Sequence, residues 1–266
     1  MEQVTTKMPR ALYNFWWVLA AVYAAWMCVF MHWDTYTMQN TLLTKEMYPS
    51  AAVYLVWVAA STVLLILYPV MLDKLLYAEK QTKAQKVFCI VTLAAGFVYI
   101  TVYGFLKNPF DYTASMMGLD YPWLFKGWAI FSGVSIFTNT MYMYRKNNYR
   151  NMAGVICTSI GCAALLVTVN LPSAGEEIVM TAQCLGHWVS AFIFAVLGAA
   201  GIVIFLVHKC IEKNKKYLIM TAVFVAILAL MLVLLVTVGK NGVIENLPMW
   251  AAYIVLALVN FTALLD

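Results

Sequence analysis

The sequence has very little charge. Only 11% of its 266 residues are Asp, Glu, Lys or Arg, whereas a soluble domain carries roughly 25%. So few charged side chains cannot cover a water-facing surface, and 64% of the residues are hydrophobic. The composition therefore excludes a disordered chain, a collagen, a coiled coil and a disulfide-stapled secreted scaffold. It indicates an integral membrane protein.

Residues that carry chemistry are also scarce. The three histidines, His32, His187 and His208, lie at the ends of apolar stretches, so they cannot pair across a haem at mid-depth. The centres of these stretches contain no ionisable residue apart from tyrosine and cysteine, which disfavours a proton-coupled transporter or a voltage sensor. No Gly-rich phosphate loop or His-Glu-x-x-His motif is present. We therefore expect no cofactor and no bound metal.

Eight apolar stretches are each long enough to cross a hydrocarbon core of ~30 Å as a helix. They are Ala11–Met31, Ala51–Leu72, Val87–Leu106, Trp123–Tyr144, Met152–Leu171, His187–His208, Tyr217–Val238 and Leu247–Leu265. They are too long and too continuous for the strands of a membrane barrel. The sequence thus predicts an all-α, polytopic transmembrane helix bundle with eight spans.

The basic residues predict how this bundle is oriented. Most of the 17 lie in four connecting segments, which the positive-inside rule assigns to the cytoplasm. These segments are Met1–Arg10, Asp73–Lys86, Arg145–Asn151 and Lys209–Lys216. The remaining lysines are Lys45, Lys107, Lys126 and Lys240. The pattern predicts that both termini are inside, in a bacterial cytoplasmic membrane. Because the charges are divided among separate loops, we expect membrane lipids as partners and no nucleic acid.

Acidic residues gather on the predicted outer side. They are Asp34, Glu46, Asp111, Asp120, Glu176, Glu177 and Glu245. Since acidic residues contribute little to topology, this bias allows two interpretations. It is either a solvated outer rim or an acidic vestibule that attracts cations.

One outer loop combines turn signals with polar residues. The Asn108–Pro109 pair ends the preceding helix, and Asp111 or Thr113 can cap a short helix that follows. At the same predicted depth, His187 opens the sixth span. Beside a carboxylate it could be a ligand, a base or a pH-sensitive gate. Alternatively, it is a helix-end histidine hydrogen-bonded to a carbonyl or to water.

These residues also resemble a known family. The pattern Asn-Pro-Phe-Asp-x-Thr-x-Ser-x-x-Gly, followed by a span that opens with Gly-His-Trp, is similar to that of a bacterial six-helix membrane family of unknown function. That family is distantly grouped with the damage-regulated autophagy modulators and related lipid-remodelling proteins. The matching positions are Asn108, Pro109, Asp111, Ser115, Gly118 and His187. The resemblance implies a six-helix membrane domain over 87–266 and a two-helix extension over 1–86, within one integrated bundle.

Two non-catalytic functions fit these features. The first is binding or passage of a small amphipathic, lipid-like molecule at the outer half of the bundle, between the third and sixth spans. Its expected ligand-binding residues are Asn108, Asp111, Ser115, Asp120, Glu176, Glu177 and His187. The second is a structural or regulatory subunit of a membrane complex, which requires a membrane-protein partner.

A third hypothesis is an outer-leaflet lipid hydrolase or acyl transferase. Ser115 would be the nucleophile, His187 its general base and Asp111 the carboxylate that orients the base. Asp120, Glu176 and Glu177 are rival partners for the histidine, and with it could instead form an oxygen-rich metal site. Ser115 does not lie in a nucleophile-elbow sequence. This hypothesis requires the Ser115 and His187 side chains to come within hydrogen-bond reach.

Overall fold

In this computed structural model, helices are the only regular secondary structure in the described part of the chain. This part comprises residues 8–37, 51–77, 81–171, 182–212 and 215–263. These residues form nine helices and no strands. The helices are α1 (Arg10–Thr37), α3 (Ala51–Leu76), α4 (Lys83–Gly104), α5 (Ala114–Asp120), α6 (Pro122–Lys146), α7 (Met152–Asn170), α8 (Ala182–Ile211), α9 (Lys215–Thr237) and α10 (Gly242–Phe261). The predicted all-α class is confirmed.

Seven of the described helices are long and apolar enough to cross a membrane. They are α1, α3, α4, α7, α8, α9 and α10. The chain is therefore a multi-pass membrane protein. The remaining predicted span is the fourth, Trp123–Tyr144. It corresponds to α6, which has 25 residues but does not belong to this apolar set.

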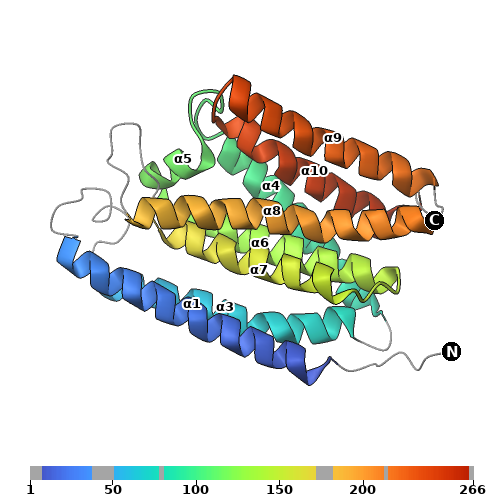
Figure 1. Cartoon of the computed structure of the whole chain (residues 1–266), viewed down its shortest axis with the longest axis horizontal. Helices are drawn as coiled ribbons and strands as arrows, with labels where there is room; N and C mark the ends of the chain where they lie inside the picture. Colours follow the sequence, from blue (N-terminus) through green and yellow to red (C-terminus); the bar gives the residue numbers. More distant parts are fainter. Residues whose placement is uncertain (1–7, 38–50, 78–80, 172–181, 213–214, 264–266) are drawn as a thin grey trace.

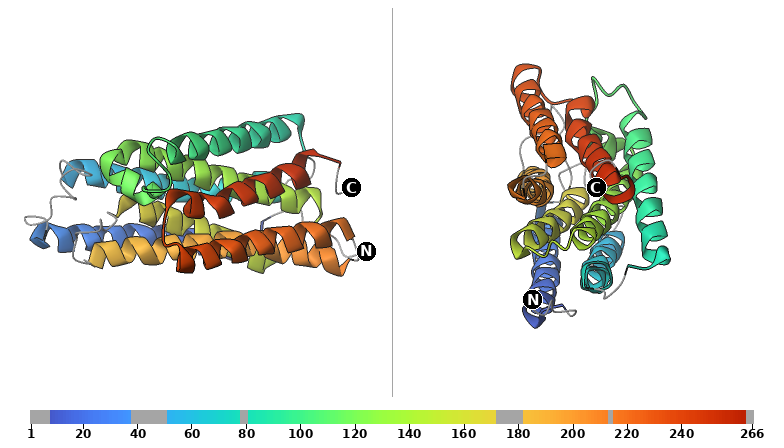
Figure 2. Two further views of the ribbon diagram at one scale, coloured as in Figure 1. Left: turned by 90° about the horizontal axis from the view of Figure 1, so that it is seen from above. Right: turned by 90° about the vertical axis from the view of Figure 1, so that its right-hand side faces the viewer.

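The long helices run side by side along the molecule (Figure 1). Seen end-on in Figure 2, α6 and α7 occupy the middle, with the other long helices around them. The start of α1 and the end of α10 lie at the same end of the bundle, whereas α5 and the turn from α9 to α10 lie at the opposite end. We call the latter end, which carries the described loops that are predicted to be outside, the α5 end.

The central position of α6 explains its low hydropathy. Its buried side chains include Ser132, Ser135, Thr138 and Asn139, each fully inaccessible to solvent. Asn139 donates from Nδ2 to the hydroxyl of Thr92 in α4 at 3.3 Å. A helix enclosed by other helices can carry polar groups, because these groups face protein rather than lipid.

The N-terminal pair α1 and α3 is attached to the centre by aromatic and polar contacts. Trp16 packs edge-on against Tyr68 at 5.3 Å and against Phe137 of α6 at 5.7 Å between ring centroids. Near the α5 end, Nδ2 of Asn170 donates to the Tyr23 hydroxyl at 2.8 Å. The first two spans thus pack directly on the helices of the predicted six-helix domain.

Helices α8 and α10 begin before the approximate starts predicted for their spans. Helix α8 begins at Ala182, before His187. Helix α10 begins at Gly242 rather than Leu247, because the Asn241 side chain accepts from the Ile244 N–H and caps it. Asn241, Gly242 and Glu245 interrupt the apolar pattern in the sequence, although the residues from Gly242 onward have the geometry of a helix.

Candidate functional site

The loop from α4 to α5 forms the base of a polar cluster. Asn108 starts a turn in which its carbonyl accepts from the Asp111 and Tyr112 N–H groups. Its Nδ2 donates to the Asp111 carboxylate at 2.5 Å. Thr113 then caps α5, accepting from the Met116 N–H at 3.1 Å. The predicted turn and the predicted Thr113 cap are confirmed, and Asn108 and Asp111 bind each other.

The start of α10 packs onto this turn. The Gly242 N–H donates to the Pro109 carbonyl at 2.8 Å, and the Val243 N–H reaches the same oxygen at 3.3 Å. A Cβ at Gly242 would lie 2.5 Å from the Tyr112 carbonyl oxygen. Only glycine permits this approach of two backbones. The approach brings the residues on either side of Gly242 next to α5.

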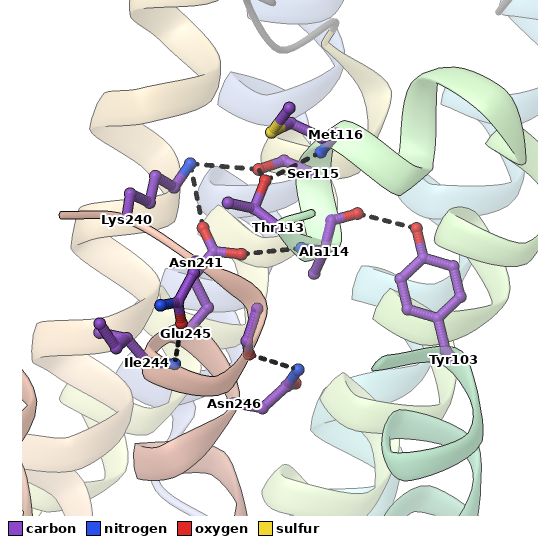
Figure 3. A network of polar contacts seen from close by, with 11 residues as sticks. Tyr103, Thr113, Ala114, Ser115, Met116, Lys240, Asn241, Ile244, Glu245 and Asn246 are labelled. Atoms are coloured by element: carbon purple, nitrogen blue, oxygen red, sulfur yellow. Dashed lines mark hydrogen bonds and ion pairs between the residues drawn. The ribbon is translucent and has the colours of Figure 1, made fainter. Parts of the chain in front are cut away.

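Lys240 and Glu245 are therefore the charged partners of the α5 start (Figure 3). Lys240 Nζ lies 3.2 Å from Ser115 Oγ and 2.9 Å from Glu245 Oε1. Oε2 of Glu245 accepts from the Ala114 N–H at 2.8 Å. Ser115 also lies 3.4 Å from the Thr113 hydroxyl. We call Thr113, Ser115, Lys240 and Glu245 the outer polar cluster.

The outer polar cluster has buried residues on one side and a partly exposed residue on the other. Thr113 and Ser115 are only 2% and 6% exposed, whereas the Lys240 side chain is one-third exposed. The Lys240 ammonium also lies 4.8 Å from the ring centroid of Trp188, an exposed residue of α8. The site is therefore open towards the surface on the Lys240 and Trp188 side.

This geometry favours binding over nucleophilic catalysis. The Lys240 ammonium pairs with the Glu245 carboxylate and donates to Ser115, so it does not act as a base for the Ser115 proton. An ammonium has three N–H donors, and Ser115 and Glu245 engage two of them. The third can donate to a phosphate or carboxylate oxygen that approaches from the Trp188 side.

His187 has other neighbours. It is 2% exposed, and its Nδ1 lies 2.9 Å from the Leu171 carbonyl oxygen. Its ring centroid is 6.2 Å from that of Phe125. Among the described residues, no hydrogen bond joins Ser115, His187 and Asp111. Ser115 contacts Lys240, and His187 contacts a backbone carbonyl, as expected of a helix-end histidine without a catalytic role. The hydrolase remains a prediction.

Asp120, another predicted site residue, has a different partner. Asp120 pairs with Lys107 at 2.5 Å, and this hydrogen bond raises the pKa of Lys107 above its ordinary value. Glu176 and Glu177 lie outside the described residues. Within the described ranges, no group of three or more His, Cys, Asp or Glu residues could hold a metal ion.

Two cavities lie at the opposite end of the bundle from the outer polar cluster. One is an apolar groove of about 430 Å³ between α9 and α10. It is lined by Lys216, Ile219, Met220, Val223, Phe224, Ile227, Ala251, Ile254, Val255 and Leu258. The other is a polar cleft of about 450 Å³ beside the start of α4. The outer polar cluster lines neither of them.

Sequence reasoning missed Lys240 and Glu245 as site residues. Glu245 was recognised as an outer acid and Lys240 as an outer lysine, but neither was paired with Ser115, which lies 125 residues before Lys240. One signal was available: Lys240 is one of few basic residues on the predicted outer side, and Asn241–Gly242 follows it as a turn motif.

Comparison of the chain with protein-family models, with curated proteins and with solved structures finds no match.

Proposed function

We propose that this multi-pass membrane protein crosses a bacterial cytoplasmic membrane eight times and binds a small amphipathic, lipid-like molecule at the α5 end of its bundle. The polar head would lie on the outer polar cluster. The observation that carries the proposal is the position of Lys240, which joins Ser115 and Glu245 and faces the exposed ring of Trp188.

The surroundings supply the apolar part of such a site. On α8, close to Trp188 in sequence, Leu185, Val189 and Phe192 are all at least half exposed. In a membrane these side chains face lipid, and tryptophan favours the boundary between lipid and water. A molecule that puts an anionic head on Lys240 can therefore lay its chain along α8.

The test is lipid binding by the full chain in detergent, counted by native mass spectrometry. Phosphatidylglycerol is the anionic probe and phosphatidylcholine the reference. We expect Lys240→Gln to remove one bound phosphatidylglycerol, because the ammonium that holds the head is lost. The matched control is Lys107→Gln, which removes another outer lysine. Equal lipid counts for wild type and Lys240→Gln would refute the proposal.

The subunit hypothesis is favoured by a different observation. Helix α9 packs on α8 and α10, and its large side chains are exposed over several faces, including Leu218, Ile219, Val233 and Val236. A partner helix could cover this surface as readily as lipid. Purification in mild detergent as a monodisperse single chain that binds lipid would count against this alternative.

A further inference from the structure

A second polar site lies at the far ends of α4 and α10 from the outer polar cluster. It is a cleft of about 450 Å³ between the start of α4 and the ends of α6 and α10. It is lined by Gln81, Thr82, Lys83, Lys86, Tyr142, Lys146, Asn260, Phe261, Thr262 and Ala263. We call it the basic cleft.

The charge of the basic cleft is of one sign. Of the described residues that line it, three are lysines and none is acidic. Lys146 donates from Nζ to the Val259 carbonyl at 2.9 Å. Lys83 and Lys86 are exposed and form no ion pair within the described ranges. Both lie in the first turn of α4, where the helix dipole is also positive, so an anion there would be stabilised.

Two buried polar side chains line the same cleft with unused oxygen atoms. Asn260 is 3% exposed, and while its Nδ2 donates to the Asn139 carbonyl, its Oδ1 has no partner. Tyr142 is 4% exposed and stacks on Phe261, and its hydroxyl makes no hydrogen bond within the described residues. The Asn260 Oδ1 is buried as well as unpartnered, which is uncommon and costly. A ligand with both an acceptor and a donor would satisfy these two groups.

We propose that the basic cleft binds a phosphate ester that also carries a hydroxyl group. The ammonium groups of Lys83 and Lys86 and the hydroxyl of Tyr142 donate to the phosphate oxygens. The Asn260 Oδ1 accepts from the ligand hydroxyl. The headgroup of a glycerol-type anionic lipid has this combination, and so does free glycerol phosphate.

A lipid is the source that the surrounding surface favours. Directly after the lysines, α4 exposes Val87, Phe88 and Val91, at 59%, 44% and 58%. An acyl chain can lie along these residues while its headgroup occupies the cleft. In the proposed orientation this lipid belongs to the inner leaflet. The inference does not depend on the outer polar cluster, because the two sites share no residue.

The experiment measures phosphatidylglycerol binding to the full chain in detergent, where no charged membrane surface contributes. We expect the double variant Lys83→Gln/Lys86→Gln to weaken binding at this site roughly 30-fold. The matched control is Lys74→Gln/Lys215→Gln, which removes the same charge at the same end of the bundle but outside the cleft. Tyr142→Phe keeps the stacked ring and should weaken binding roughly fivefold.

The outcomes separate the sources and the two sites. If phosphatidylglycerol binds and millimolar glycerol phosphate does not displace it, the result supports a lipid as the ligand. If glycerol phosphate saturates the cleft and phosphatidylglycerol does not bind, the lipid is wrong and the ligand is a soluble phosphate ester. Equal weakening in the cleft variant and in the control variant overturns the proposal, because it indicates non-specific attraction. Lys240→Gln should leave binding at the cleft unchanged, so failure at either site is distinguishable from failure at the other.

Discussion

At the scale of single residues, Gly242 decides whether the outer polar cluster can form. Its backbone N–H binds Pro109, and a side chain there would collide with backbone atoms of the α4–α5 loop. Backbone cannot move aside as a flexible side chain can. We expect Gly242→Ala to reduce the free energy of unfolding by about 1–3 kcal/mol, seen as a lower melting temperature in detergent.

The control for this variant is Gly198→Ala. A Cβ at Gly198 would meet Phe194 at 3.7 Å, which is an ordinary van der Waals distance, and alanine is the better helix former. Its melting temperature should therefore equal or exceed that of the wild type. If Gly242→Ala has the same melting temperature as Gly198→Ala, then α10 does not approach the α4–α5 loop as closely as described.

The same residues show how far sequence can predict the site. The Asn108 turn and the Thr113 cap were predictable, because the groups that form them are within a few residues of each other. The pairing of Ser115 with Lys240 was not, because it depends on where α10 packs. Polar residues predicted at the same depth can pair in many different ways. Only the packing of α5 against α10 determines that Ser115 contacts Lys240 and not His187.

At the scale of helices, α7 connects the N-terminal pair to the rest of the bundle through Asn170. Its Nδ2 lies within hydrogen-bond distance of the Tyr23 hydroxyl and, at 3.1 Å, of the Ser61 hydroxyl. Asn170→Ala would remove the amide group that both hydroxyls contact. We expect a loss of about 1–2 kcal/mol in stability, measured by thermal unfolding in detergent.

Ser159→Ala is the matched change within α7. Ser159 is fully buried, but its hydroxyl bonds to the Val155 carbonyl of its own helix at 2.7 Å, so its removal breaks no contact between helices. This variant should lose clearly less stability than Asn170→Ala. Equal losses would mean that Asn170 does not couple α1 and α3 to α7.

Helix α6 shows what hydropathy can and cannot predict about an element. Continuous apolar runs predict lipid-facing helices well, because lipid selects apolar side chains on every exposed face. A helix enclosed by protein is free of that selection. The sequence from Trp123 to Tyr144 predicted the position of α6 closely, yet its burial, and the polar residues that burial permits, depend on the arrangement of its neighbours.

At the scale of the whole molecule, the exposed residues and the two ends of the bundle bear on orientation. Large apolar side chains are exposed along α1, α4, α8 and α9, as expected of surfaces in lipid. The start of α1 and the end of α10 lie at one end of the bundle (Figure 1). An even number of crossings gives this arrangement, and the proposed eight crossings include α6.

The crossing by α6 is the part of this topology that most needs a test, since α6 alone among the long helices is not apolar enough by composition. Phe110, before α6, is 69% exposed, and Asn148, after it, is also exposed. With the N-terminus inside, a membrane-impermeant maleimide should label Phe110→Cys in intact cells and Asn148→Cys only after permeabilisation, with the unaltered chain as background. The reason is that α6 separates the two positions by the thickness of the membrane. Labelling of both positions, or of neither, in intact cells would show that α6 does not cross, and labelling of Asn148→Cys alone would show that the orientation is inverted.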